Sequence, residues 1–137
     1  MTQPISDLQT LLALLASMEP VLNDGVYVFA SVGTPHAMAL GDVVASIREP
    51  EGLSVVLTEA RALALQLPIL FRCAWITLTV HSDLQAVGLT AAFARALGDA
   101  GISCNVVAGA YHDHIFVPVE RAQDAMAALR QLQRVTI

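Results

Sequence analysis

The chain contains no lysine and few charged residues of any kind. All seven basic residues are arginine, and charged side chains make up 14% of the sequence. Without lysine, the chain has no amine side chain that could form a Schiff base with a carbonyl substrate. The arginines are scattered rather than gathered into a stripe, and the net charge is −5. A basic stripe is typical of nucleic-acid-binding proteins, so nucleic acid is not an expected partner.

A targeting segment and a long apolar run are also missing. The first basic residue is Arg48, whereas a secretory signal peptide begins with positive charge. The uncharged segment over residues 8–18 is 11 residues long, short of the roughly 20 that span a bilayer. We therefore expect a cytoplasmic protein with no membrane partner.

Only two cysteines are present, Cys73 and Cys104. Cys73 lies just before one predicted strand and Cys104 lies on another, and a split βαβ arrangement places a third strand between these two. Their backbones are then about 10 Å apart, beyond the roughly 4.4–6.8 Å between the Cα atoms of a disulfide. We expect two free thiols.

The clearest pattern in the chain covers residues 74–132. Alternating β-branched residues predict a strand over 74–81, and apolar residues at helical spacing predict a helix that begins near residue 87. A strand over 102–108, a turn at 111–113, a returning strand over 115–119 and a helix over 119–132 follow. This order is most of a ferredoxin-like unit. The side chains predicted to be buried in its strands are Ile76, Leu78, Val80, Val106, Ile115 and Val117, with Trp75, Thr77 and Thr79 on the opposite face.

The first half is predicted to have strands and helices of its own, in a different order. An amphipathic helix over residues 5–15 precedes a strand over 26–32. The turn residues 49–52 (EPEG) join two strands into a hairpin. Thr58 is the expected N-cap of a helix that runs to Leu67. The inward positions expected for that helix are Ala60, Leu63, Ala64 and Leu67.

Three segments resemble the ACT domain, a small regulatory module that binds amino acids. They are residues 82–89 (SDLQAVGL), 101–105 (GISCN) and 113–117 (DHIFV). The whole chain resembles small bacterial proteins with two ACT-like halves. The resemblance implies an α+β fold of ferredoxin-like βαββαβ halves, with antiparallel sheets and helices on one face. It also implies an N-terminal ACT-like half over residues 1–70 and a C-terminal ACT domain over residues 71–137.

The helix start near Gly88 is the best candidate binding site. The first N–H groups of a helix are unpaired and carry partial positive charge, which suits a carboxylate. Gly88 has no Cβ, so either a ligand approaches its backbone closely or the glycine serves only tight packing. Together with the resemblance, this predicts that the backbones of Val87, Gly88 and Leu89 hold the carboxylate of an amino acid.

The ammonium group of such a ligand needs an acceptor. Asp113 stands where related tandem proteins carry an acidic residue near the ligand, although capping the turn before it is an equally common use of aspartate. Asn105 is a further candidate, because its amide both donates and accepts hydrogen bonds. In paired ACT modules the ligand lies between two units, and the resemblance suggests Ser46 and Ile47 as the opposite wall.

Three functions fit these features. The first is a non-catalytic regulatory or sensor protein that binds an amino acid and acts on a separate regulated protein. The second is an ACT-like structural or interaction dimer without a ligand. The third is a small metal enzyme built on the run His112-Asp113-His114, whose two imidazoles would share one face of a strand.

The number of possible metal-binding side chains and the composition narrow these three functions. Two histidines do not make a metal site, so we expect no metal and no cofactor. The hydrophobic fraction is 55% and charges are few, which leaves apolar surface for a partner and predicts a homodimer.

Overall fold

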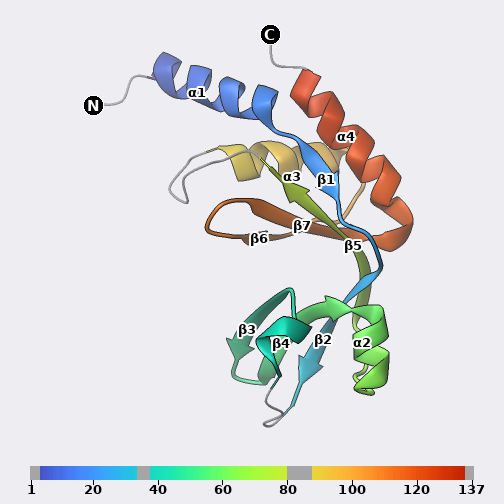
Figure 1. Cartoon of the computed structure of the whole chain (residues 1–137). Helices are drawn as coiled ribbons and strands as arrows, with labels where there is room; N and C mark the ends of the chain where they lie inside the picture. Colours follow the sequence, from blue (N-terminus) through green and yellow to red (C-terminus); the bar gives the residue numbers. More distant parts are fainter. Residues whose placement is uncertain (1–3, 34–37, 80–87, 135–137) are drawn as a thin grey trace.

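The computed structural model describes residues 4–33, 38–79 and 88–134 (Figure 1). The elements before the middle of the chain are α1 (Pro4–Ser17), β1 (Pro20–Leu22), β2 (Tyr27–Val32), the short 3-10 helix η1 (Leu40–Asp42), β3 (Ala45–Glu49), β4 (Gly52–Thr58) and α2 (Glu59–Ala64). The elements after it are β5 (Phe71–Leu78), α3 (Leu89–Asp99), β6 (Asn105–Ala108), β7 (Asp113–Pro118), the 3-10 helix η2 (Val119–Arg121) and α4 (Ala122–Arg134).

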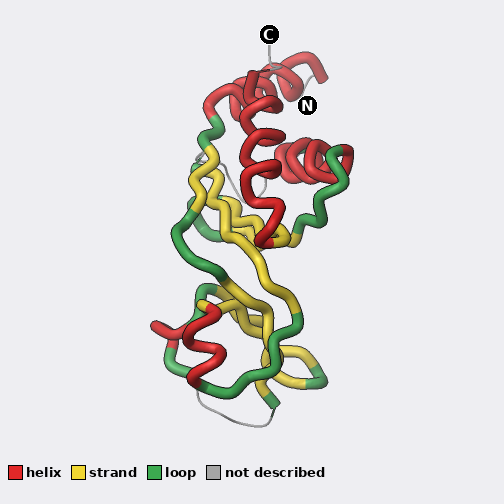
Figure 2. The backbone as a smooth tube through the Cα atoms, turned by 90° about the vertical axis from the view of Figure 1, so that its right-hand side faces the viewer, coloured by secondary structure: helices red, strands yellow, loops and turns green. Residues whose placement is uncertain are grey.

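The described strands form one antiparallel sheet in the order β3-β4-β2-β5-β7-β6. β5 is the strand that the two parts share. Its first residues, Phe71–Cys73, pair with β2, and Cys73–Leu78 pair with β7 on the other side. β1 pairs with Ile76–Leu78 on the same side as β2. The strands therefore run through the narrow waist between the upper and lower parts of the molecule (Figure 2).

Each part of the sheet repeats one strand order. The first unit consists of β2, β3 and β4, with the beginning of β5 as its fourth strand, in the order β5-β2-β4-β3. The second unit consists of β5, β6 and β7, with β1 as its fourth strand, in the order β1-β5-β7-β6. The predicted α+β fold of ferredoxin-like units is confirmed.

Helices cover one face of this sheet. Over the second unit, α3 and α4 bury their apolar faces against Ile76, Leu78 and Ile115. Over the first unit, α2 places Ala62 in a separate core with Val28 and other strand residues. α1 belongs with the second core, to which it contributes Leu15, and Met18 just after the helix packs in the same core.

The positions of α1 and β1 in the sequence matter for the division of the chain into two halves. Both precede residue 70 in the sequence, yet they pack on the unit formed by residues 71–134. The division into residues 1–70 and 71–137 stays a prediction. Of the side chains expected to be buried, Ile76, Leu78, Ile115 and Val117 are fully buried, Val106 is half-buried, and Val80 lies outside the described residues.

The predicted inward face of α2 is wrong. Ala60, Leu63 and Ala64 are exposed, whereas Ala62 is buried and Leu67 is half-buried. The helix has six residues, so its apolar residues cover too few turns for their spacing to fix its rotation. The predicted N-cap is confirmed, because the Oγ1 atom of Thr58 accepts a hydrogen bond from the N–H of Arg61.

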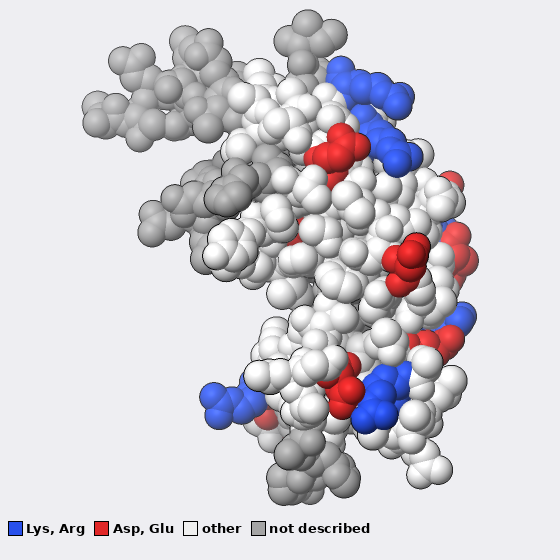
Figure 3. Space-filling view, viewed as in Figure 1, with Lys and Arg blue, Asp and Glu red and all other residues white. Residues whose placement is uncertain are grey.

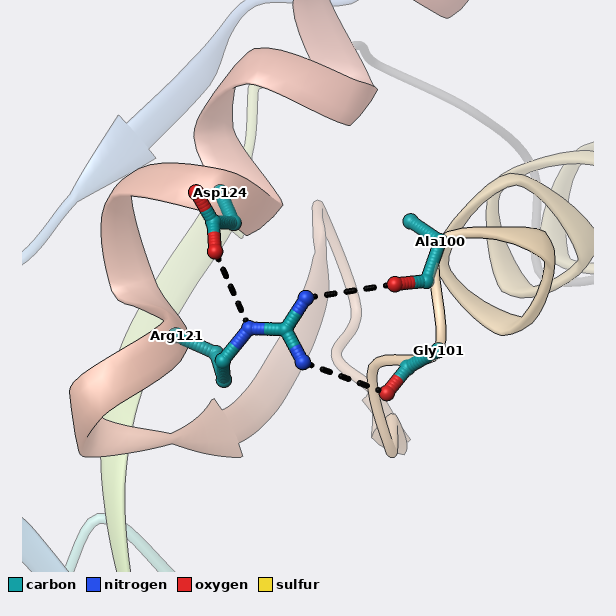
Figure 4. Close-up of polar contacts among 4 residues, drawn as sticks. All are labelled: Ala100, Gly101, Arg121 and Asp124. Carbon is teal, nitrogen blue, oxygen red and sulfur yellow. Dashed lines mark hydrogen bonds and ion pairs between the residues drawn. The ribbon is translucent and has the colours of Figure 1, made fainter.

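Arg121 ties the end of α3 to the start of α4 (Figure 4). Its guanidinium donates to the carbonyl oxygens of Ala100, at 3.2 Å, and Gly101, at 3.4 Å. The same group pairs with the carboxylate of Asp124 at 3.0 Å. Carbonyl groups at the end of a helix lack intrahelical partners and carry partial negative charge, so this arginine supplies donors to the end of α3.

The two cysteines are free, as predicted. β7 separates the strand that carries Cys73 from the strand that follows Cys104.

No helix in the described part of the chain combines the length and the apolar character needed to cross a membrane.

The packing of α1 on the second unit predicts unequal effects for two leucine truncations. Leu15 is 5% exposed in the second core, so Leu15→Ala should lower the free energy of unfolding by about 2–4 kcal/mol. Leu63→Ala removes the same atoms from a side chain that is 61% exposed and should change it by less than about 0.5 kcal/mol. Urea denaturation measures both, and equal effects would show that α1 is not packed on the second unit.

Candidate functional site

Gly88 stands at the N-cap of α3 with a φ of 98°. This left-handed conformation favours glycine. A Cβ at this position would lie 3.1 Å from the Cδ2 atom of Leu11. α1 therefore packs directly on the start of α3, and the close approach permitted by the missing side chain is made by Leu11. Val87 lies outside the described residues.

The backbone at the start of α3 is the part of this position that suits an anion. No side chain caps the helix within the described residues. The carbonyl of Gly88 accepts the N–H of Ala92, but the N–H groups of the first turn have no partner within the helix. Leu89 is 2% exposed and packs in the second core, so its side chain is not open to a ligand.

Asp113 lies at the same end of the sheet. It is the first residue of β7 and pairs with Leu78, the last residue of β5, and the chain continues from β5 toward α3. Ile115 and Val117 on the same strand belong to the core beneath α3 and α4. Because alternate strand residues share a face, Asp113 is on the helix-covered face, beside the end of β5.

The Asp113 carboxyl is poorly solvated. The residue is 9% exposed, and burial raises the pKa of its carboxyl group, with a smaller opposing effect from His114. Within the described residues, no donor holds the carboxylate strongly enough to lower this pKa. A cationic group placed beside it would relieve the cost of keeping it charged.

The structure does not bring the other predicted residues to Asp113. Asn105 pairs with Phe116 in the register of β6 and β7, so it lies on the sheet face without helices. Asn105 is exposed, and solvent can satisfy its amide. Ser46 and Ile47 are in the first unit on the edge strand β3, and Ile47 is 61% exposed.

Ser46 and Ile47 nevertheless lie near the second unit. Together with Phe29 of β2 and Val107 of β6, they line a small apolar pocket of about 50 Å³. Ile47, Phe29 and Val107 share the face without helices. Of the predicted residues that the structure describes, Asn105 and Ile47 are on the face without helices. Gly88, Leu89 and Asp113 belong to the helix-covered side of the second unit, and Ser46, which pairs with Val55, belongs to the helix-covered side of the first.

An aromatic cluster occupies that face, which sequence reasoning missed. The ring centroids of Tyr27 and Trp75 are 5.3 Å apart, and those of Phe29 and Phe116 are 5.6 Å apart. Both contacts have the edge-to-face geometry that aromatic pairs prefer. In the space-filling view the hollow side of the molecule is bordered mainly by uncharged atoms, while charged side chains gather on the convex side (Figure 3).

His114 is held in a polar network on the same face. Its Nδ1 atom accepts a hydrogen bond from the indole N–H of Trp75 at 3.0 Å and lies 3.2 Å from the hydroxyl of Thr77. The amide of Asn23 donates to that hydroxyl at 3.0 Å. Burial lowers the pKa of His114, which keeps the imidazole neutral and able to accept.

The neighbouring His112 is arranged differently. Its Nδ1 atom is buried and has no hydrogen-bond partner among the described residues. In the part of the chain that the structure describes, no three histidine, cysteine or acidic side chains gather closely enough to hold a metal ion.

The two thiols have little nucleophilic character. Burial raises the pKa of Cys73 to about 12 and that of Cys104 to about 11. Both groups are therefore protonated at neutral pH, when a thiol is a weak nucleophile.

The sequence matches two ACT domain models in tandem. One covers residues 4–74 and the other residues 70–131. The chain belongs to the ACT domain family. The two models meet at the beginning of β5, the strand that both ACT units share.

Solved structures support the ACT fold over most of the chain. A Vibrio cholerae protein of unknown function, described as a possible transport protein, is 48% identical, with a TM-score of 0.80, over 93% of this chain and 99% of that one. An Agrobacterium tumefaciens protein is 16% identical with a TM-score of 0.71, over 85% and 89% of the two chains. No curated protein sequence matches the chain significantly.

A third solved structure relates the fold to a named regulatory subunit. The regulatory subunit of aspartate kinase from Thermus thermophilus, in a ligand-free form, is 13% identical with a TM-score of 0.63. The match covers 85% of this chain and 96% of that one. At this identity the likeness establishes the tandem ACT fold.

Burial of Asp113 predicts a stabilising substitution. A raised pKa means that the folded chain holds this proton more tightly than the unfolded chain, so ionisation of Asp113 with rising pH costs stability. Asp113→Asn removes that cost and should raise the free energy of unfolding at pH 7. The gain should vanish below about pH 3.9, the unfolded pKa of aspartate.

Denaturation across pH values measures this effect. Asp99→Asn is the matched control, because the Asp99 side chain is 74% exposed and its neutralisation should change stability little. If Asp113→Asn is less stable than the natural chain at pH 7, the carboxylate has a stabilising partner and this account of its environment is wrong.

Proposed function

We propose that this tandem ACT protein binds a free amino acid and acts as a non-catalytic regulatory or sensor protein on a separate partner. The observation that supports the proposal is a buried, poorly solvated carboxyl, Asp113, on the helix-covered face beside the end of β5, the strand that precedes α3 in the chain. One end of an amino acid is anionic and the other is cationic. The uncapped start of α3 suits the first, and Asp113 suits the second.

The contacts in this proposal are mainly to backbone. The ligand carboxylate meets N–H groups of Gly88 and Leu89, since the Leu89 side chain is buried and Leu11 covers the position of a Cβ at Gly88. The ammonium meets Asp113, whose pKa is raised by burial and would fall when a cation pairs with it. Binding therefore releases a proton whenever Asp113 is protonated in the free protein.

The contact between Leu11 and Gly88 favours a second candidate, an ACT-like interaction dimer without a ligand. In that candidate Gly88 serves only the packing of α1 on α3. Asp113 then has no binding role, and its burial only lowers the stability of the fold. The two candidates differ in one measurable property, the response of the protein to amino acids.

We also propose that the protein is cytoplasmic and forms a homodimer. Its edge strands are β3 and β6, and an edge strand offers unpaired N–H and C=O groups to a second chain. On β3, Ile47 is 61% exposed, which adds apolar surface to that edge.

A thermal screen with free amino acids tests the binding proposal. A ligand at about 100 times its dissociation constant adds about 2.7 kcal/mol of stability. For a chain of this size that corresponds to a rise in melting temperature on the order of 10 °C. We expect at least one amino acid to produce such a shift at millimolar concentration, and Asp113→Asn to reduce the shift measured from its own ligand-free melting temperature.

The control is again Asp99→Asn, which should respond as the natural chain does. Gly88→Val is unsuited to this test, because the left-handed φ and the contact with Leu11 would disturb the fold itself. Absence of any shift across the amino acids would refute binding and leave the interaction dimer.

The homodimer is tested by light scattering at tens of micromolar, where a weak specific dimer is populated. We expect twice the mass of one chain, and Ile47→Asp should reduce the dimer fraction by placing a charge on the edge of β3. Leu63→Asp, at an equally exposed position on α2, is the control. A natural chain that is monomeric throughout this range would contradict the prediction.

A further inference from the structure

The two ACT units differ in the helices that cover them. In the second unit, β5 is followed by the 11-residue helix α3 and then by β6. At the same point of the first unit, β2 is followed by the three-residue η1 and then by β3. The first unit therefore has α2 on its covered face, and the described residues between β2 and β3 contain only η1, where the second unit has α3.

A cavity of about 380 Å³ lies beside η1. It is bounded by Val32 at the end of β2, by Met38 and Asp42 around η1, and by Arg61, Leu65 and Leu67 from α2 and the residues after it. Its volume is within the range of about 300–1,000 Å³ that small-molecule pockets occupy. Val32 is 3% exposed, so the cavity reaches down to the sheet.

One wall of the cavity carries a cation with spare hydrogen-bond donors. The Nε atom of Arg61 is 3.1 Å from the Oδ1 atom of Asp42, and its Nη2 atom is 3.3 Å from Oδ2. Guanidinium has five N–H donors in a planar fork. Within the described residues these contacts engage Nε and Nη2 and leave the two N–H groups of Nη1 for a further acceptor.

The remaining lining is aliphatic. Val32, Met38 and Leu67 pack against the core of the first unit, and Leu65 completes the apolar side. The only carboxylate among the described lining residues is Asp42, and both of its oxygens face Arg61. The cavity thus offers donors to an anion and apolar surface to a short hydrocarbon, and no carboxylate among its described lining side chains is left to pair with an ammonium group.

We propose that this cavity binds a small aliphatic monocarboxylate. The carboxylate accepts hydrogen bonds from Nη1 of Arg61, and the hydrocarbon body packs against Met38, Leu65 and Leu67. This site is separate from the one at Asp113 and goes beyond the proposed function, since its ligand needs no amino group. It gives the protein a second chemical input, carried by the first unit.

Isothermal titration calorimetry with 4-methylpentanoate tests the proposal, with 4-methylpentanamide as its uncharged analogue. We expect the carboxylate to bind the natural chain and the amide to bind at least tenfold more weakly. Arg61→Gln should weaken carboxylate binding at least tenfold. Arg95→Gln, at an arginine whose side chain is 84% exposed in another ion pair, should leave it unchanged.

A second variant separates binding from a structural role of the ion pair. Asp42→Asn keeps the size of the side chain but removes the charge that competes for the guanidinium, so it should tighten carboxylate binding. If the ion pair only fixes η1 on α2, Arg61→Gln and Asp42→Asn would weaken binding alike, and that result would overturn the proposal.

The two binding proposals can be refuted separately. Asp113→Asn should not change the binding of 4-methylpentanoate. Loss of its binding in that variant would place the carboxylate at the start of α3 and refute the cavity site. No heat at 10 mM carboxylate would refute it as well, whatever the amino acid screen shows.

Discussion

The architecture depends on β5 and on the three strands that it pairs with. Its first residues bond to β2, its later residues bond to β1, and its opposite edge bonds to β7. One strand of eight residues thus completes the first ACT unit and begins the second. A break in its hydrogen bonding would divide the one sheet into two parts, so the units cannot move as independent domains on a flexible linker.

The side chains of β5 show how one strand serves two environments. Ala74, Ile76 and Leu78 face the helices and are at most 3% exposed, while Cys73 and Trp75 face the aromatic cluster. Because alternate residues point to opposite faces, a slip of one residue would exchange the two sets. The register is therefore fixed twice, by the helix-covered core and by the rings on the other face, and Asn23 adds a hydrogen bond to the carbonyl of Trp75 at 2.9 Å.

The sequence was most informative where one periodicity extends over a long segment. β5, α3 and α4 could be predicted because their apolar residues repeat over at least eight positions. β1 could not, because it has three residues and its partner is more than 50 positions away in the chain. The buried face of α2 was predicted wrongly because this helix, too, is short, with six residues. Asp113 was predicted to lie beside the helix start, whereas the face and strand order that separate it from Asn105 depend on pairings the sequence does not display.

The two units share a strand order but differ in chemistry where the first strand ends. After β5 the chain enters a full helix, and the buried group nearby is an acid, Asp113. After β2 the described residues form the short η1, and the group that faces the cavity beside it is a base, Arg61. An arginine at the wall of this cavity gives it a preference for anions. Duplication of one fold thus produces two unlike positions, because each unit keeps the sheet and changes what covers it.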